Sequence, residues 1–248
     1  LPGPFFSTVV LGALPILDIG SEDQKQEYLP RIASGDAIFT LASIEADARY
    51  DAASIISKAT PQGENYSIEG TKFFVPDVNV ADYLLCVART NGQARPGEGI
   101  SIFLIDAKSP GISHTLLKTI AGDKLCEVIF QHVLVPKGDI LGQLGQGWDR
   151  IQKIIEKAAV AKCFEIVGNI QQVLEMTVEY AKTRKQFDRA IGSFQVIQHY
   201  CADMATLVDG SRFATYQAAW MLNEGLPCSK EIAIAKAWVG EASQHVIS

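Results

Sequence analysis

Two polar side chains flank one short turn in the second half of the sequence. Arg184 stands at the end of an amphipathic stretch that closes at about Phe187, and Gln195 follows Ser193, which opens the next stretch. Because both lie at one end of long predicted helices, both can reach a single anionic ligand outside their own helices. The sequence has no G-x-G-x-x-G phosphate loop. A structural role is the alternative, with Arg184 at a helix C-terminus and Phe187 as a core residue.

Histidines and cysteines are the other side chains that could do chemistry. The histidines show no metal-ligand spacing, which predicts no metal site. The cysteines are odd in number, far apart and embedded in apolar runs, which predicts reduced core thiols and favours an intracellular compartment. The four histidines are His114, His132, His199 and His245. The five cysteines are Cys86, Cys126, Cys163, Cys201 and Cys228.

Charge and hydropathy limit the possible partners. The chain has 248 residues and a net charge of −6, with Lys and Arg dispersed. It offers no basic stripe for nucleic acid and no polybasic membrane patch, and no stretch reaches the roughly 20 apolar residues of a membrane span. The apolar first residues lack a basic region and contain three prolines, unlike a signal peptide. We expect both ends to be cut edges of a larger protein.

The hydrophobic period changes twice along the chain, which predicts three segments. Up to residue 35 the pattern is helical, with a capping box at Ser21 and Gln24 and a terminating Gly35. From Ala37 the period is two, and seven short β-branched runs separated by turn residues predict a small antiparallel barrel or sandwich. After Pro136 the period returns to 3.6, typical of a bundle of long helices. The expected fold is thus α+β, with segments 1–35, 36–138 and 139–248.

Five runs, in order, resemble the acyl-CoA dehydrogenase family of flavoproteins over essentially the whole chain. They are GSEDQKQEYLPRIASGD, YSIEGTKFFV, GISIFLIDAKSPGI, VLVPKGDILGQLGQGW and YAKTRKQFDRAIGSFQVIQHYCADMA. The resemblance implies a middle β-domain followed by a helical bundle. It also implies FAD as cofactor, an acyl-CoA substrate, and a homo- or hetero-oligomer that passes electrons to an electron-transfer flavoprotein or similar acceptor. The compartment implied is the cytoplasm, or the mitochondrial matrix in a eukaryote.

The family's R-x-x-F motif gives the first cluster a specific role. By similarity, Arg184, Phe187 and Gln195 contact the adenine-dinucleotide half of an FAD that a neighbouring subunit mainly binds. The residue types agree: a guanidinium grips a pyrophosphate by two hydrogen bonds, an aromatic ring covers the ring system, and an amide donates and accepts.

Two loops depart from the family's flavin-binding pattern. The first of these loops in the family typically reads T-E-P-x-x-G-S-D, and the matching stretch of this chain reads IEADARYD. Ile44 replaces the Thr that backs the flavin, and Tyr50 replaces a Ser near the pantetheine, where its ring is expected to block the acyl-pantetheine arm. The second loop in the family typically reads W-I-T-N. In this chain Phe74 keeps an aromatic residue at the first position, but Pro76 replaces the Thr near flavin N5 and offers no hydroxyl or N–H. Phe74 and Pro76 could equally just end a strand.

The general base is missing from the positions that the resemblance indicates. Removing the α-proton of a thioester requires a carboxylate within hydrogen-bond reach. The family's Glu is expected beyond Ser248, or at a position that here holds Ala158. Glu165, one turn further on, is a displaced candidate, but its spacing from Lys162 favours an ion pair between the two.

Two functions from different classes therefore follow. One is α,β-dehydrogenation of an acyl-CoA thioester, with proton loss from Cα and hydride transfer from Cβ to flavin N5. The other is a non-catalytic partner subunit that completes a neighbour's FAD site, because the motif serving the neighbour survives while Ile44, Tyr50 and Pro76 have changed. A third, less favoured reading is a monooxygenase of the same fold with a non-CoA substrate.

Overall fold

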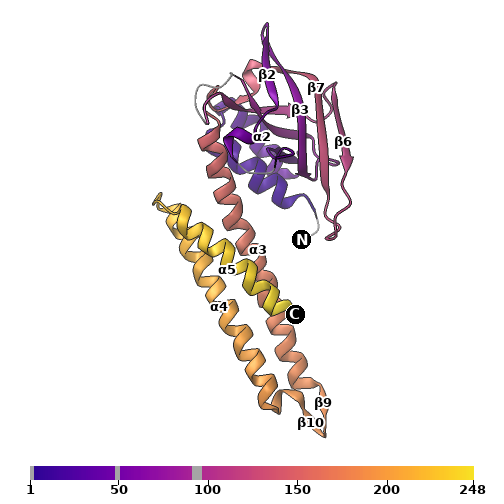
Figure 1. The fold of residues 1–248 in the computed structure, drawn as a ribbon, viewed down its shortest axis with the longest axis vertical. Coiled ribbons are helices and arrows are strands. Elements are labelled where there is room, and N and C mark those ends of the chain that lie inside the picture. Colours follow the sequence, from indigo (N-terminus) through magenta and orange to yellow (C-terminus); the bar gives the residue numbers. More distant parts are fainter. Residues whose placement is uncertain (1–2, 48–50, 91–96) are drawn as a thin grey trace. The chain divides into compact units, whose positions relative to one another are not determined.

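The computed structural model describes residues 3–47, 51–90 and 97–248 (Figure 1). The chain divides into two compact units, Leu1–Ile154 and Ile155–Ser248, and the division falls inside one long helix, α3 (Trp148–Thr183). Each unit has hydrophobic clusters of its own and is described by itself below. The finer division at residues 35 and 138 stays a prediction.

The first unit begins with three consecutive helical segments. They are a π-helix η1 (Phe6–Ala13), α1 (Leu14–Ile19) and α2 (Glu22–Ser34). The predicted capping box is confirmed: the Ser21 hydroxyl accepts from Gln24 N, and the Gln24 side chain accepts from Ser21 N. Gly35 ends α2 with a φ of 83°, a left-handed conformation that glycine adopts at little cost.

The sheet contains the seven predicted strands and one short addition. The strands are β1 (Phe39–Ala42), β2 (Lys58–Gln62), β3 (Asn65–Pro76), β4 (Tyr83–Arg89), β5 (Ile100–Asp106), β6 (Ile112–Leu116), β7 (Leu125–Pro136) and β8 (Ile140–Leu141). Their order is β6-β7-β3-β2-β4-β5-β8, with β1 beside β4. Strands β2, β3, β7 and β6 can be followed side by side in Figure 1.

Strand β4 is buried on both faces because a separate hydrophobic cluster lies on each. Cys86 and Ala88 face the cluster formed mainly by β3, β5 and β7, whereas Leu85 and Val87 face the cluster shared with helices α1, α2 and the start of α3. The side chains of β5 alternate between the same two clusters. The helices therefore cover one face of the sheet, and its other face closes on the remaining strands.

Two details differ from the sequence expectation. Strand β1 pairs in parallel with β4, and β2 meets β4 in a single parallel bridge, so the sheet is not wholly antiparallel. Local alternation carries no information about strand direction, which is decided by long connections. In addition, the second predicted run, SIISKAT, becomes a strand only from Lys58, and its first residue, Ser54, ends a short 3-10 helix, η2 (Ala52–Ser54), which Asp51 caps by accepting from Ser54 N at 2.8 Å.

The second unit consists of helices joined by short connections. From Ile155 helix α3 continues to Thr183, a two-stranded hairpin follows with β9 (Lys185–Gln186) and β10 (Arg189–Ala190), and a 3-10 turn η4 (Ile191–Ser193) leads into α4 (Gln195–Asn223). Helix α5 (Ser229–Ile247) packs beside α4. Small and branched residues of the three helices, such as Val167, Ala218 and Ile232, form one hydrophobic cluster, and a second cluster lies around Ile170 and Val208. The predicted helical segment is confirmed.

All five cysteines are free thiols, as predicted. Four are buried and Cys201 is partly exposed. Burial raises the pKa of the Cys86 thiol to about 11, and it also raises the pKa of the other buried thiols, Cys126, Cys163 and Cys228. In the part of the chain that the structure describes, no helix is long and apolar enough to cross a membrane.

Alkylation of the native protein at pH 8 should therefore modify Cys201 first and leave Cys86 intact. The thiolate is the reactive form, so a thiol that is both buried and held neutral reacts slowly. Peptide mass spectrometry after timed exposure to iodoacetamide measures the order, with urea-unfolded protein as the control in which every cysteine reacts. Comparable rates at Cys86 and Cys201 in the native protein would contradict the buried position of Cys86.

Candidate functional site

In the first unit, the two predicted flavin loops lie against one another. The backbone N–H of Phe73 donates to the Ile44 carbonyl at 2.9 Å, which joins the loop after β1 to the end of β3. Ile44 itself is half-buried. The structure thus brings Ile44 close to the segment that holds Phe74 and Pro76, although Ile44 precedes them by 30 and 32 residues in the sequence.

Phe74 occupies a strained position that exposes its ring. The pairing of β3 with β7 shifts register between Lys72 and Val75, and Phe74 lies in this bulge with a φ of 54°. Its ring is 47% exposed. A non-glycine residue in the left-handed region costs free energy, and such residues persist where their surroundings hold them. The backbone is therefore bent so that an aromatic surface faces outward rather than into the core.

The backbone around Pro76 is held by neighbouring hydroxyl groups. Thr40 Oγ1, fully buried, donates to the Pro76 carbonyl at 2.5 Å, and the Ser7 hydroxyl donates to Asp77 Oδ2 at 2.6 Å. Asp77 also has a positive φ of 55°, and its N–H donates to the Lys124 carbonyl. Because the hydroxyl of Thr40 is engaged by the backbone, it does not replace the hydroxyl that Pro76 lacks.

A buried ion pair lies directly behind these loops. Lys72 Nζ is 2.6 Å from Glu45 Oε1, and the side chains are 0% and 3% exposed. The Glu45 carboxylate also accepts from the backbone N–H groups of Ile56 at 3.0 Å and Ser57 at 3.1 Å. Sequence reasoning missed Lys72, but a signal was present. Lys72 is an even number of residues from Tyr66 and Ile68 along β3, and both of these point into the core.

The other residues of the first loop can be placed only in part. Tyr50, predicted to block the acyl-pantetheine arm, lies outside the described residues. Asp51, which the chain shares with the family pattern, caps η2 through its side chain. Its presence is thus accounted for by local structure.

In the second unit, Arg184, Phe187 and Gln195 gather at one end of the helices. Arg184 follows the last residue of α3, Phe187 lies in the hairpin turn and Gln195 is the first residue of α4. All three are exposed, and in the described part of the chain the Arg184 guanidinium has no hydrogen-bond or ion-pair partner. Phe194 provides no side-chain cap, so the first N–H groups of α4 and its positive dipole end face outward. This arrangement suits an anion.

The hairpin turn exposes an aromatic ring at a conformational cost. Phe187 and Asp188 have φ values of 51° and 62°, and the Phe187 ring is 86% exposed. Phe187 meets Phe194 edge to face with ring centroids 6.1 Å apart, and the Arg189 guanidinium lies 4.1 Å from the centre of the Phe194 ring. Sequence reasoning missed Arg189, because its contact depends on the hairpin register that places it across from Gln186.

The structure places the candidate base in an ion pair. Lys162 Nζ lies 2.6 Å from Glu165 Oε2, so the pairing expected from their spacing is confirmed. Near the start of this unit, the Ser229 hydroxyl donates to Glu156 Oε1 at 2.5 Å. Ala158, at the position where a carboxylate was considered, is half-buried.

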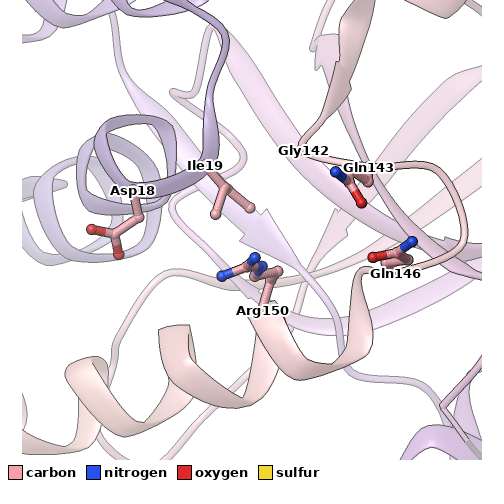
Figure 2. Close-up of a pocket in the computed structure, with 6 residues that line it drawn as sticks. All are labelled: Asp18, Ile19, Gly142, Gln143, Gln146 and Arg150. Atoms are coloured by element: carbon pink, nitrogen blue, oxygen red, sulfur yellow. The ribbon is translucent and has the colours of Figure 1, made fainter. Parts of the chain in front are cut away.

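A cavity of about 210 Å³ lies elsewhere in the first unit (Figure 2). Its walls come from the end of α1, the turn after β8 and the first turn of α3, and Figure 2 shows the Arg150 side chain between these segments. The lining residues are Asp18, Ile19, Gly142, Gln143, Gln146 and Arg150. Of the predicted site residues that the structure describes, none lines it. Across the described residues, no cluster of His, Cys, Asp or Glu could hold a metal ion.

The first unit combines helices with a β-sheet and carries a half-exposed aromatic near a buried ion pair, and the second unit is helical with an exposed R-x-x-F hairpin. Comparison with known proteins identifies the class of this fold. Residues 3–36, 40–133 and 145–248 match the N-terminal, middle and C-terminal domains of the acyl-CoA dehydrogenases. The chain belongs to the acyl-CoA dehydrogenase family.

Curated relatives cover nearly all of this chain. It is 33% identical over 237 residues to an acyl-CoA dehydrogenase of Bacillus subtilis and 30% identical over 237 residues to a 3-(aryl)acrylate reductase of Clostridium sporogenes. It is also 30% identical over 237 residues to the CarC subunit of the caffeyl-CoA reductase-Etf complex of Acetobacterium woodii. Each alignment covers 94% of this chain, but this chain spans only 62–63% of these relatives.

Solved structures share the fold closely. Butyryl-CoA dehydrogenase from Megasphaera elsdenii superposes with a TM-score of 0.91 at 28% identity, covering 98% of this chain and 64% of that one. A structure of PigA with FAD and proline gives a TM-score of 0.90 at 26% identity, with the same coverage. A structure described under the electron transferring flavoprotein of Acidaminococcus fermentans gives 0.92 at 31%, again covering 98% and 64%. The predicted fold class is confirmed.

Replacing Asp188 by Gly should stabilise the second unit by roughly 0.5–1 kcal/mol, since relief of the left-handed strain exceeds the entropy that glycine adds to the unfolded chain. Urea unfolding measures the change. Asp203→Gly, at an exposed position inside α4, is the matched control and should destabilise, because glycine is a poor helix former. Lower stability of Asp188→Gly would show that Asp188 is not strained.

Proposed function

We propose that this chain is part of an FAD-dependent enzyme that dehydrogenates an acyl-CoA thioester between Cα and Cβ. The observation that carries the proposal is the contact between the two loops of the first unit, where the Phe73 N–H to Ile44 carbonyl hydrogen bond places an exposed aromatic at the end of the sheet of an acyl-CoA dehydrogenase fold. Bound FAD supplies the hydride acceptor for this reaction. Everything else the site does must come from the chain itself.

The residues of the first unit fit the flat, largely apolar surface of a flavin ring. Phe74 and Ile44 offer an aromatic and an aliphatic surface, held by the Phe73 N–H bond and by the bond from Thr40 to Pro76. In this proposal, Phe74 covers one part of the ring, and Ile44 and Pro76 exclude water without donating hydrogen bonds. The family pattern has a Thr hydroxyl near flavin N5, and Pro76 of this chain has no group that could donate in its place.

The residues of the second unit fit the charged half of the same cofactor. The Arg184 guanidinium has no partner among the described residues. Together with the open N-terminus of α4 at Gln195, it offers donors and positive potential to a pyrophosphate. Phe187 offers a ring surface to the adenine. We propose that this FAD is held mainly by a neighbouring chain, so that the functional form is an oligomer. An electron-transfer flavoprotein or a similar acceptor, and the cytoplasm or mitochondrial matrix, remain part of this proposal.

A non-catalytic partner subunit is the second candidate. It is favoured by the contrast between the two units: the exposed Arg184, Phe187 and Gln195 are all present, whereas Ile44 and Pro76 lack the hydroxyl groups that a flavin loop would use. In this case the chain completes a flavin site on a different subunit and needs no base of its own.

Anaerobic titration with straight-chain and branched acyl-CoA thioesters separates the candidates. If the intact protein is the enzyme, it carries one flavin per chain and an acyl-CoA bleaches the flavin absorbance. If it is a helper subunit, it co-purifies with a different subunit, with one flavin per two chains. Oxygen consumption with reduced flavin and no response to acyl-CoA would instead indicate a monooxygenase.

Arg184→Ala in the intact protein should weaken FAD retention by about 1.5–3 kcal/mol, the scale of a lost hydrogen bond to a charged group. Flavin content after extensive dialysis, measured against protein concentration, provides the comparison. Lys182→Ala is the matched control, because Lys182 lies at the same helix end but is only 3.9 Å from Glu179 in an exposed pair. Equal flavin retention in the Arg184 variant and the control would refute the role of Arg184.

Glu165→Gln should leave kcat/KM for the preferred acyl-CoA within about twofold of the wild type, because an exposed ion pair contributes little and surface substitutions are nearly neutral. Steady-state kinetics of the intact enzyme tests this. A loss of several orders of magnitude, with the flavin still bound, would identify Glu165 as the base that abstracts the proton.

A further inference from the structure

We infer that Glu45 and Lys72 are a positioning pair that fixes the two loops of the flavin site relative to one another. This inference rests on the proposed function, since it assigns the pair a role at that site. The two side chains are almost completely buried, so neither offers a surface to a ligand. Their effect must pass through the residues beside them in the sequence.

Those neighbours are the residues that form the exposed surface of the site. Glu45 directly follows Ile44, and Lys72 lies two residues before Phe74. The 2.6 Å contact between Lys72 Nζ and Glu45 Oε1 therefore runs beside the 2.9 Å bond from Phe73 N to the Ile44 carbonyl. One backbone bond alone would leave the loops free to pivot, whereas two bonds at adjacent positions fix their relative orientation.

The carboxylate also fixes a third segment, between η2 and β2. It accepts from the N–H groups of Ile56 and Ser57, while the Ser57 carbonyl accepts from the Arg89 N–H of β4 at 2.8 Å. Gly70 allows this approach, because a Cβ there would lie 2.2 Å from the Ser57 hydroxyl. A single carboxylate thus gathers the loop after β1, the start of β2 and the end of β3.

The energetics give the pair little freedom to adjust. A buried charge is expensive unless it is paired and hydrogen-bonded, so both groups gain by keeping their short contact. In the described residues, Glu45 is the only hydrogen-bond acceptor of the Lys72 ammonium. Because Phe74 follows in a left-handed conformation that its surroundings must hold, loosening Lys72 should let the bulge relax.

The double variant Glu45→Gln/Lys72→Met tests the inference without leaving an unpaired buried charge. Amide hydrogen exchange of the protein without added FAD should become roughly tenfold faster or more in segments 43–47 and 71–77, the scale of a lost hydrogen bond to a charged group. The central strand β4 should exchange as before. In the FAD-loaded oligomer the visible absorption spectrum of the flavin should shift, because the ring surface is presented differently.

The exposed pair formed by Lys137 and Glu64, 3.6 Å apart in the same unit, gives the matched control. Glu64→Gln/Lys137→Met should change neither the exchange of the two segments nor the flavin spectrum. Should the double variant not fold, Glu45→Asp keeps the charge but shortens the reach by one methylene, and it should show the same local acceleration.

Each outcome decides something different. Unchanged exchange in both segments, or unchanged flavin spectra in a folded variant, would overturn the positioning role. Accelerated exchange in a protein that takes up no flavin even as wild type would defeat the proposed function, and would leave the pair with a structural role only. A uniform acceleration across β4 and β5 would also overturn the inference, since it indicates global destabilisation.

Discussion

The contact between the Lys72 ammonium and the Glu45 carboxylate constrains the first unit more than any apolar contact does. Apolar contacts are non-directional, but two buried charges cannot separate without leaving each in a medium that solvates it poorly. Strand β3, the loop after β1 and the segment before β2 are therefore held to one geometry. The exposed surface at Ile44 and Phe74 is a consequence of that geometry.

Strain and exposure coincide at both sets of residues that are proposed to contact a cofactor. Phe74 in the first unit and Phe187 in the second each have a left-handed backbone, and each turns its ring outward. An exposed aromatic side chain does not contribute the stabilisation that burial would give, and a left-handed backbone at a non-glycine residue costs free energy. Under the proposed function, ligand binding accounts for the cost at each residue. Phe187 lies in an R-x-x-F hairpin beside the uncapped start of helix α4. This position is consistent with a ligand that is both anionic and aromatic.

Periodicity predicted the elements well because it reflects which face of each element is buried. The capping box at Ser21 and Gln24, the seven strand runs and the long helices were all readable in this way. The parallel pairing of β1 with β4 was not, because alternation is the same for either strand direction. The hairpin residues were found through a motif, whereas Lys72 and Thr40 were missed because their roles depend on contacts across the sheet. The position of Lys72 within the alternation was the available signal.

The central claim is that one flavin is bound by the loop residues of one chain and the hairpin residues of another. Subunit exchange between Phe74→Ala and Arg184→Ala oligomers, each depleted of flavin, tests this directly. Each mixed pair would contain one site with both wild-type halves, so FAD binding should reappear on mixing and increase with the measured fraction of mixed oligomers. If mixed oligomers form and bind no more FAD than the parent variants, the site is not shared between chains and the account is wrong.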